Sequence, residues 1–322
     1  MKKISIITPC YNEEVNVFDL YIKVKDIFKN LDYEYEHLFI DNCSTDKTVN
    51  ILEDIASKDK NVKIIVNSRN FGQIRSAWYG TLQTKGDANI GICADFQDPP
   101  ELIPEFIKKW EDGYKIVLAK KTRSKENKLI YFLRTSYYKF LGKISEVELL
   151  ENVTGYGLYD RSIVEITRKL KEPYPYSRGI ICEIGYEKAI IEFTQPKRKG
   201  GKSKSNFYNL YDLAMLGIVN NSKIPLRIAS ISGFIMSILS LITAFVYLVL
   251  KLIHWDSFNA GTAPILIGIF FFSAIQLFFL GILGEYIGVL LTRVTDRPHV
   301  FEKKRINFDN ETNDSTAKEN GN

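Results

Sequence analysis

Three polar segments near the N-terminus carry the side chains best suited to chemistry. They are Pro9-Cys10-Tyr11-Asn12-Glu13-Glu14, Asp41-Asn42-Cys43-Ser44-Thr45-Asp46 and Asp95-Phe96-Gln97-Asp98-Pro99-Pro100. In an extended segment side chains alternate between two faces, so Asp95 and Gln97 can present two oxygens to one cation. Magnesium and manganese prefer oxygen ligands, and magnesium on a diphosphate needs only one or two protein carboxylates. The third segment therefore predicts a Mg²⁺ or Mn²⁺ site, in which Asp98 either supports the ligands from behind without binding the ion or serves as an alternate ligand.

The polar segments follow predicted strands, and these strands alternate with predicted helices. Short β-rich runs indicate strands over residues 3–8, 35–40, 62–66 and 88–94. Apolar side chains at helical spacing indicate helices over residues 14–29, 46–58 and 73–83. This alternation is typical of a parallel sheet with crossover helices, which binds ligands at the carboxyl ends of its strands. We expect the three segments to share one cleft there, and a solvated turn is the alternative for any single one.

Two apolar stretches, residues 226–253 and 263–291, predict membrane helices. Each is long enough to cross about 30 Å of hydrocarbon. Their near lack of charge favours membrane spans over a pair of buried core helices. Cations flank the pair, at Arg227 and from Arg293 onward, but are missing from the connector 254–261. Because short cationic loops stay inside, the pattern predicts a cytoplasmic N-terminal domain and cytoplasmic termini.

Other features disfavour several classes of protein. The N-terminus lacks the pattern of a signal peptide, since its apolar run covers only residues 4–7. The cysteines, at positions 10, 43, 93 and 182, lack paired spacing, which fits reduced thiols and disfavours a zinc site. The net charge is +5 and no stripe interleaves cations with aromatics, so we expect no nucleic-acid partner. Residues 303–322 are polar and are predicted to be disordered.

A basic cluster precedes the first apolar stretch. Residues 197–204 interleave five cations with Gly200 and Gly201, whose backbone lets an anion approach closely. The cluster predicts a phosphate site, and the alternative is a patch that attracts anionic lipid at about 1 kcal/mol per cation. Residues 129–143 and 206–219 combine apolar side chains with basic flanks, so they are predicted to lie on a membrane surface or to be ordinary core helices.

Further motifs lie between and after the three polar segments, and together they follow one another along the chain in a characteristic order. They are Asn70-Phe71-Gly72-Gln73, Glu101, Arg198, Gly201-Lys202-Ser203-Lys204, Pro225-Leu226-Arg227, Gly284-Glu285-Tyr286 and Arg297-Pro298. With these motifs the chain resembles the family 2 inverting glycosyltransferases of the GT-A fold, in particular the polyprenyl-phosphate glycosyltransferases related to dolichyl-phosphate mannose synthase and bactoprenol glucosyltransferases. The resemblance covers residues 1 to about 300. Each motif alone is weak, but the ordered set is specific.

The resemblance implies an α/β chain with four parts. A GT-A (Rossmann-like) catalytic domain would occupy residues 1–200, and a juxtamembrane amphipathic segment residues 201–225. A two-helix transmembrane hairpin would follow at residues 226–292, and a largely disordered cytoplasmic tail at residues 293–322. The expected location is the plasma (inner) membrane, multi-pass, with the catalytic domain in the cytoplasm. Homo-oligomers are expected by analogy alone.

The resemblance also implies roles for individual residues. The residues lining the base and ribose pocket of the donor would be Pro9, Tyr11, Glu13 and Asp41. Asp95 and Gln97 would bind Mg²⁺ or Mn²⁺ on the donor diphosphate, so Asp95 belongs to the donor site as well. The residues holding the acceptor phosphate near the membrane would be Arg198, Ser203 and Lys204. Asp95 and Arg198 are the expected catalytic residues.

The implied reaction is transfer of a hexose from a nucleotide-diphosphate sugar, by analogy a UDP-sugar, to polyprenyl (undecaprenyl) phosphate on the cytoplasmic leaflet, for cell-envelope glycan modification. Cys93 and Gly155 stand where many relatives carry carboxylates. A general base is not required, however, because a phosphate monoester with a second pKa of about 6 is already ionised at pH 7. Asp160, the remaining acidic candidate, is equally consistent with a helix cap.

Three alternative functions stay open. A processive polysaccharide synthase is disfavoured because the chain lacks a Gln-x-x-Arg-Trp segment. A membrane-tethered nucleotide-sugar-binding protein without turnover would explain Cys93 and Gly155. A glycosyltransferase acting on another acceptor would share the donor site. Glu285, which is costly in hydrocarbon, marks either a functional site or the inner membrane interface, and we prefer the interface.

Overall fold

The computed structural model describes residues 1–123, 136, 141–145, 150, 153–170, 172, 175–196, 207–253, 262–295 and 297–308. The chain divides into two compact units. Unit 1 comprises Met1–Tyr138, Glu148–Ser205 and Asp296–Asn322, and it contains the β-sheet. Unit 2 comprises Lys139–Val147 and Asn206–Thr295, and it contains the long apolar helices.

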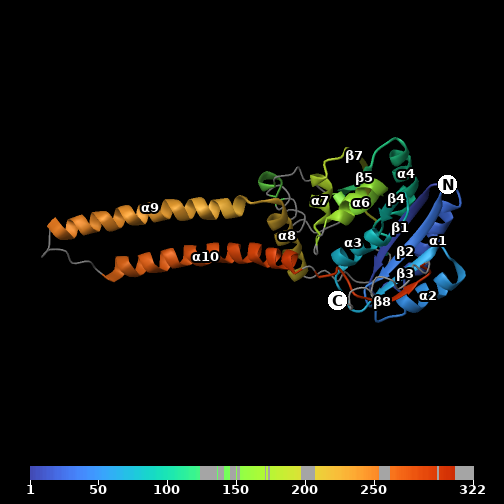
Figure 1. Cartoon of the computed structure of the whole chain (residues 1–322), viewed down its shortest axis with the longest axis horizontal. Helices are drawn as coiled ribbons and strands as arrows, with labels where there is room; N and C mark the ends of the chain where they lie inside the picture. Colours follow the sequence, from blue (N-terminus) through green and yellow to red (C-terminus); the bar gives the residue numbers. More distant parts are fainter. Residues whose placement is uncertain are drawn as a thin grey trace, which may run out of the picture. The chain divides into compact units, whose positions relative to one another are not determined.

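Unit 1 is built on an eight-stranded sheet with the order β7-β5-β6-β4-β1-β2-β3-β8 (Figure 1). Its strands are β1 (Lys3–Cys10), β2 (Glu34–Asp41), β3 (Val62–Asn67), β4 (Ala88–Gly91), β5 (Ile116–Arg123), β6 (Val153–Asp160), β7 (Lys188–Thr194) and β8 (Glu302–Ile306). β1 pairs in parallel with β2 and β4, and β2 pairs in parallel with β3. The predicted parallel sheet is therefore confirmed for the first four strands. Because β6 runs antiparallel to β4 and β5, and β8 antiparallel to β3, the complete sheet is mixed.

Helices connect the parallel strands, as the sequence pattern predicts. The helical elements of unit 1 are α1 (Val17–Phe28), α2 (Thr48–Lys58), α3 (Gln73–Gln83), η1 (Pro100–Leu102), α4 (Ile103–Glu111), α6 (Arg161–Lys169) and α7 (Ser177–Glu183). The bounds of α3 are those predicted, while α1 and α2 begin slightly later than predicted. The central strands are buried on both faces, and Ile6, Phe39 and Ile64 are each 0% exposed. Short runs of consecutive apolar residues, such as Leu38-Phe39-Ile40 of β2, fit strands that are buried on both faces.

Residues 293–322 are predicted to form a largely disordered tail, and β8 corrects this expectation for residues 302–306. It pairs antiparallel with β3, with Ile306 opposite Ile64, and Ile306 packs against the core. An edge strand buries little of its surface, so a mostly polar sequence can form it. The prediction of disorder rested on composition, which does not reveal a partner strand elsewhere in the chain. Residues 309–322 lie outside the described residues.

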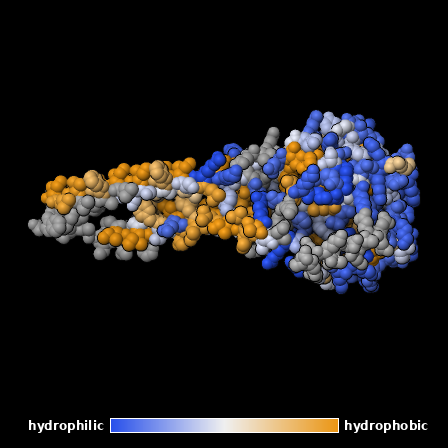
Figure 2. Space-filling view, viewed as in Figure 1, coloured by the Kyte–Doolittle hydropathy of each residue, from blue (hydrophilic) through white to orange (hydrophobic). Residues whose placement is uncertain are grey.

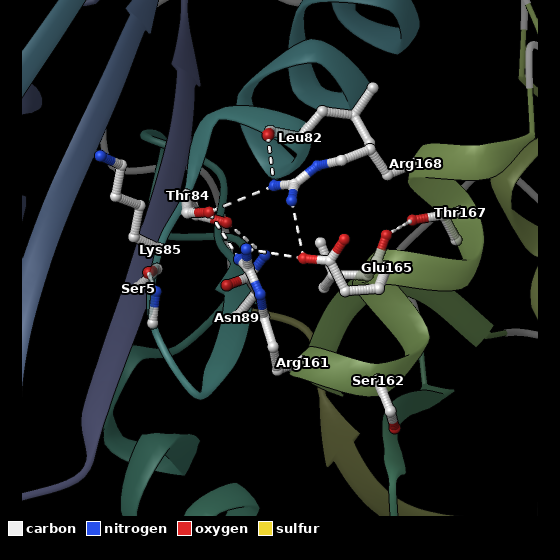
Figure 3. A network of polar contacts seen from close by, with 12 residues as sticks. Ser5, Leu82, Thr84, Lys85, Asn89, Arg161, Ser162, Glu165, Thr167 and Arg168 are labelled. Atoms are coloured by element: carbon white, nitrogen blue, oxygen red, sulfur yellow. Dashed lines mark hydrogen bonds and ion pairs between the residues drawn. The ribbon is translucent and has the colours of Figure 1, made fainter. Parts of the chain in front are cut away.

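α6 is anchored to the connection between α3 and β4 by a network of polar contacts (Figure 3). Nη1 of Arg161 donates to the carbonyl oxygen of Thr84 at 2.6 Å, and Nη2 of Arg168 donates to that of Leu82 at 2.7 Å. Glu165 forms ion pairs with both arginines at 2.7 Å. Carbonyl groups at the end of α3 are thereby satisfied by side chains of a distant helix, which stabilises that end.

Unit 2 contains α8 (Phe207–Asn221), α9 (Ile224–Ile253) and α10 (Thr262–Val294). Within the described residues one helical segment, Phe271–Val294, is long and apolar enough to cross a membrane, and it is not buried in the structure. A further candidate joins Ala214–Asn220 to Ile224–Ser240 across a bend of 72°. Hydrophobic residues cover much of the visible surface of α9 and α10 (Figure 2). Length and composition thus support one membrane helix, and a two-helix hairpin stays a prediction.

Glu285, the acidic residue of the second apolar stretch, has a hydrogen-bond partner within unit 2. The hydroxyl of Tyr211 on α8 donates to Oε1 of Glu285 on α10 at 3.0 Å. This contact lowers the cost of a half-buried carboxyl group in an apolar helix. The predicted surface segment 206–219 forms most of α8, whereas most of residues 129–143 lies outside the part of the chain that the structure describes.

Glu36 on β2 is a charged side chain in the core of unit 1, only 2% exposed. Oε1 accepts hydrogen bonds from the Ser5 hydroxyl at 2.6 Å and the Lys85 backbone N–H at 3.0 Å. Nζ of Lys63 lies 2.8 Å from Oε2. Burial by itself would raise the pKa of Glu36, but the hydrogen bonds from Lys63, Ser5 and Lys85 outweigh it and lower the pKa to about 2.

We expect Glu36→Gln to remove part of the acid dependence of stability. The folded pKa lies below the ordinary 4.5, so the folded form binds fewer protons between these values. The charge therefore contributes about 3 kcal/mol of stability that is complete above the unfolded pKa and lost as pH falls toward the folded one. Thermal unfolding of both proteins between pH 3 and 7 measures this: their Tm difference should be largest near pH 7 and shrink below pH 4. A difference independent of pH would contradict the assignment.

Candidate active site

The carboxyl ends of β1, β2 and β4 bring the three polar segments to one edge of the sheet. β1 lies between the other two strands, and all three run in the same direction (Figure 1). Beyond the β1–β2 ladder, the backbone N–H of Asn42 donates to the carbonyl oxygen of Cys10 at 2.9 Å. Beyond the β1–β4 ladder, the N–H of Ile92 donates to the carbonyl oxygen of Ile7 at 2.9 Å. The expected common edge is confirmed.

Asp41 is the most enclosed of the predicted donor-binding residues, with 0% of its surface exposed. Oδ2 accepts a hydrogen bond from the backbone N–H of Ser44 at 2.9 Å. Oδ1 has no hydrogen-bond partner among the described residues. Burial raises the pKa of Asp41, although hydrogen bonds from Ser44 oppose the rise. A buried acceptor without a partner is costly, so Oδ1 is a candidate contact for an N–H group of a ligand.

Three other predicted donor-binding residues lie on the first polar segment, beside Asp41, whereas Asp95 lies on the third. Pro9 lies on β1, one position before the residue that pairs with Asp41. Tyr11 follows the end of β1 and is partly exposed. Glu13 is 8% exposed, and its Oε2 accepts a hydrogen bond from Nδ2 of Asn16 at 2.7 Å. The fold brings these residues into one region, while their roles toward a nucleotide stay predictions.

The segment that contains Asp95 is a turn, which corrects the expectation of an extended segment. β4 ends at Gly91 rather than continuing through residues 88–94. Phe96 has φ 61°, in the left-handed region, and the backbone N–H of Gln97 donates to Oδ1 of Asp95 at 3.1 Å. In such a turn the aspartate side chain itself binds the backbone two residues on. Turn geometry, and not strand alternation, therefore orients Asp95 and Gln97.

Negative charge is concentrated beside this turn. Asp98 is 5% exposed, and its Oδ2 accepts a hydrogen bond from the backbone N–H of Cys93 at 3.0 Å. Burial raises the pKa of Asp98 to about 6; hydrogen bonds from Cys93 oppose the rise and the charge of Asp95 adds to it. Burial, followed by the charges of Asp98, Asp95 and also Glu13, raises the pKa of the Cys93 thiol. Cys93 is therefore a neutral thiol among acidic groups.

This crowding of acidic groups fits a divalent cation, which would offset their repulsion. The described residues contain no group of three or more His, Cys, Asp and Glu side chains that could hold a metal by themselves. A cation would then depend on one or two carboxylates, with phosphate oxygens of a ligand completing its shell. Asp95, which is 9% exposed, is suitably placed to bind such a cation. The neighbouring Gln97 is half-buried.

The sequence did not reveal that Asn42 forms hydrogen bonds with the loop of residues 68–72. Asn42 is 4% exposed, and its Oδ1 accepts hydrogen bonds from the backbone N–H of Phe71 at 2.9 Å and the Ser76 hydroxyl at 3.0 Å. Its Nδ2 donates to Oδ1 of Asn70 at 2.8 Å. The asparagine and the loop motif are both visible in the sequence, but nothing there indicates that the two bind each other.

The predicted acceptor-binding residues Arg198, Ser203 and Lys204 lie outside the described residues, so the structure does not place them beside the donor edge. Gly155 is on β6, and a Cβ atom added there would meet nothing within 4 Å. It lines, with Arg178 and others, a cavity of about 20 Å³, which is enough for a single water molecule.

Asp160 is a structural residue. Its side chain caps α6 by accepting a hydrogen bond from the backbone N–H of Ser162 at 2.9 Å. Its Oδ2 also accepts a hydrogen bond from Nε1 of Trp110 at 2.8 Å. The interpretation as a helix cap is confirmed, which supports leaving Asp160 out of the catalytic set.

Comparison with known proteins identifies the group to which these features belong. The model of the family described as "Glycosyl transferase family 2" matches residues 5–167. The putative glycosyltransferase CsbB of Bacillus subtilis (strain 168) is 36% identical over 301 residues, which cover 94% of this chain and 91% of that protein. The bactoprenol glucosyl transferase of Shigella phage SfX is 34% identical over 304 residues, covering 94% and 99% respectively.

Among solved structures, the chain is similar to glucosyl-3-phosphoglycerate synthase from Mycobacterium tuberculosis, crystallised with Mn²⁺, uridine-diphosphate and phosphoglyceric acid. The TM-score is 0.46 and the sequence identity 17%. The similarity covers 68% of this chain and 76% of that one.

Proposed function

The chain belongs to glycosyl transferase family 2, and from that premise we propose that it transfers a hexose from a nucleotide-diphosphate sugar, by analogy a UDP-sugar, to polyprenyl phosphate with inversion at the anomeric carbon. The similarity to a bactoprenol glucosyl transferase, which extends over 94% of this chain, supports the proposal of this acceptor. The structural observation that supports the proposed donor site is that Asp41 and Asp95 lie at one sheet edge, on opposite sides of β1. Ligands of open α/β sheets bind along such an edge.

Asp41 and its neighbours form the proposed base and ribose pocket. Oδ1 of Asp41, buried and without a partner among the described residues, accepts an N–H group of the base. Pro9 and Tyr11 line the pocket from the end of β1. Glu13, already held by Asn16, faces the ribose side. These roles follow the family resemblance, and the burial of Asp41 and Glu13 supports them.

Asp95 and Gln97 are the proposed ligands of Mg²⁺ or Mn²⁺ on the donor diphosphate. The concentration of acidic groups around Cys93 supports a cation at this position. When bound, the ion neutralises the charge that develops on the departing diphosphate. Asp95 is thus a catalytic residue in this scheme, and its turn fixes the carboxylate before substrate arrives.

The acceptor phosphate supplies the nucleophile. One of its oxygens forms a bond to the anomeric carbon while the bond from that carbon to the diphosphate oxygen breaks, and the electron pair leaves with the nucleoside diphosphate. No proton is transferred, because the phosphate is largely ionised at pH 7 with a second pKa of about 6. Cys93 and Gly155, which cannot act as carboxylate bases, fit this mechanism. Arg198, Ser203 and Lys204 are proposed to hold the acceptor phosphate, with Arg198 stabilising its reacting form.

The proposed setting is the cytoplasmic leaflet of the plasma (inner) membrane. Residues 1–200 form the catalytic domain, residues 201–225 the juxtamembrane segment and residues 226–292 a two-helix hairpin. The exposed apolar surface of Phe271–Val294 supports membrane insertion, since such a surface is costly in water. Pairing through the membrane helices would give a homo-oligomer.

A transfer assay with purified full-length protein tests this function. Radiolabelled UDP- and GDP-sugars are incubated with undecaprenyl phosphate, with magnesium or with EDTA. We expect a chloroform-extractable labelled lipid that forms only with the metal. Nucleotide binding without any product would favour the membrane-tethered binding protein, and label transferred only to an added non-lipid sugar would favour a different acceptor.

A further inference from the structure

The described chain after α10, residues 297–308, returns to the sheet of unit 1, and we call it the return segment. Its second half contains β8 on the edge of β3. Its first half runs past the carboxyl end of β3, where Val300 is 4% exposed. β3 ends beside the donor edge, at the loop of residues 68–72. The two halves of the return segment therefore contact opposite ends of one strand.

The first half of the return segment contacts the loop at Ser68 and Phe71, and it also contacts Arg75 of α3, which lies beside the Phe71 ring. The backbone N–H of Ser68 donates to the carbonyl oxygen of Phe301 at 2.8 Å. Nη2 of Arg75 on α3 donates to the carbonyl oxygen of Pro298 at 3.0 Å. The rings of Phe71 and Phe301 lie 6.2 Å apart at 43°, and the guanidinium carbon of Arg75 lies 5.4 Å from the Phe71 ring.

The same loop is attached to the donor edge on its other side. The backbone N–H of Phe71 binds Oδ1 of Asn42, and Nδ2 of Asn42 binds Oδ1 of Asn70. Oδ1 of Asn70 also accepts a hydrogen bond from the N–H of Gly72 at 2.8 Å. Asn42 directly follows Asp41. A chain of packed and hydrogen-bonded groups thus connects the return segment to the residue after the buried carboxylate.

The loop has little else to fix its conformation. Ser68, Arg69 and Asn70 are exposed. Gly72 adopts φ 85°, and because glycine has no side chain it does not itself restrict the backbone of the loop. A loop with so few buried groups depends on its neighbours for order. In the described residues those neighbours include Asn42, Cys43, Arg75 and the return segment.

We propose that the first half of the return segment is a positioning element for donor binding. Phe301 contacts the loop of residues 68–72 directly, the Pro298 carbonyl group supports it through Arg75 of α3, and the loop in turn positions Asn42 and with it Asp41. This assignment rests on the proposed donor pocket around Asp41. A site whose supporting groups are fixed in advance binds its ligand without the cost of ordering them. Phe301 and Arg75 are therefore positioning residues, because neither needs to touch the nucleotide.

The other half of the return segment supplies a matched control. Nδ2 of Asn307 donates to the carbonyl oxygens of Ala56 at 2.7 Å and Val62 at 2.9 Å, at the amino end of β3. These bonds stabilise β8 but lie at the opposite end of the strand from the donor edge. Asn307 has φ 60°, so Asn307→Gly removes the amide without straining the backbone.

The experiment compares full-length Phe301→Ala, Phe301→Leu, Arg75→Met and Asn307→Gly with the wild type. Titration with UDP and with GDP gives the nucleotide Kd, the transfer assay gives KM for the donor and kcat, and thermal unfolding gives Tm. We expect Phe301→Ala and Arg75→Met to raise the Kd and KM about tenfold with little change in kcat, since donor binding must then order a group that the wild type already holds in place. Phe301→Leu should recover most of the affinity, and Asn307→Gly should lower Tm alone.

Equal Kd values for Phe301→Ala and Asn307→Gly at similar Tm would overturn the positioning role. If Phe301→Ala does not fold, Arg75→Met provides the comparison, because it removes the hydrogen bond to the Pro298 carbonyl group and the charge beside the Phe71 ring while it keeps a long apolar side chain. An Asp41→Asn variant, tested in parallel, distinguishes failure of the proposed donor pocket from failure of the positioning role alone. If Asp41→Asn leaves the nucleotide Kd unchanged, the donor pocket is wrongly placed; if it weakens binding while Phe301→Ala and Arg75→Met do not, only the positioning role fails.

Discussion

Replacing Asp95 by Asn should lower kcat/KM for sugar transfer by about a hundredfold or more, because the variant loses the carboxylate that would hold the cation on the donor diphosphate. The amide keeps the size of the side chain and can still accept the hydrogen bond from the Gln97 backbone N–H. The turn should therefore persist while the charge is lost. Initial rates of labelled lipid formation at several magnesium concentrations measure the effect.

The appropriate control is Asp160→Asn, which alters a partly buried aspartate of the same unit that has only structural contacts in the described residues. Asparagine is also a good helix cap, so α6 should be retained. We expect this variant to keep nearly all of its activity. EDTA should reproduce the effect of Asp95→Asn in the wild type. Full activity of Asp95→Asn without added metal would exclude the proposed role of this residue.

Replacing Asp41 by Asn should weaken nucleotide binding about thirtyfold, which corresponds to the loss of roughly 2 kcal/mol from one charge-assisted hydrogen bond. The same change should not lower Tm. Burial raises the folded pKa of Asp41 above its unfolded value, so ionisation of this carboxyl opposes folding, and this cost grows as pH rises from the unfolded pKa to the folded one. Removal of the charge relieves that cost at pH 7. Lower affinity with equal or higher stability is the signature of a residue retained for binding.

Glu36→Gln provides the comparison for Asp41→Asn. Both carboxylates are buried on β2, but Glu36 lies near the amino end of the strand and its oxygens are bound by groups of the protein itself. We expect Glu36→Gln to lower Tm and to leave the Kd for UDP unchanged. Nucleotide titration and thermal unfolding of the two variants give opposite patterns if Asp41 binds the donor. Similar patterns would mean that Asp41 is only a structural residue.

Local sequence patterns were sufficient for the first four strands and for α1 to α3. β1 to β3 each contain two or three consecutive apolar residues, as expected of strands buried on both faces, and such a run can be identified without knowing its neighbours. Since parallel strands end at a common edge, the same patterns were enough to place the polar segments of Asp41 and Asp95 together. The cap role of Asp160 was also visible locally, because a cap bonds to residues only two positions away.

The sequence by itself determined the first four of the eight strands, the sheet edge that carries the acidic side chains and the apolar stretch that contains Phe271–Val294. Only the tertiary structure revealed the turn at Asp95, the hydrogen bonds between Asn42 and the loop of residues 68–72, and the pairing of β8 with the edge of β3. For Asn42 and β8 the reason is the separation of the partners along the chain. Asn42 binds Phe71 and Ser76, at separations of 29 and 34 residues, and Arg75 binds Pro298 at a separation of 223. Periodicity and composition report the preferences of one segment, whereas these contacts depend on which distant segments the folded sheet brings together.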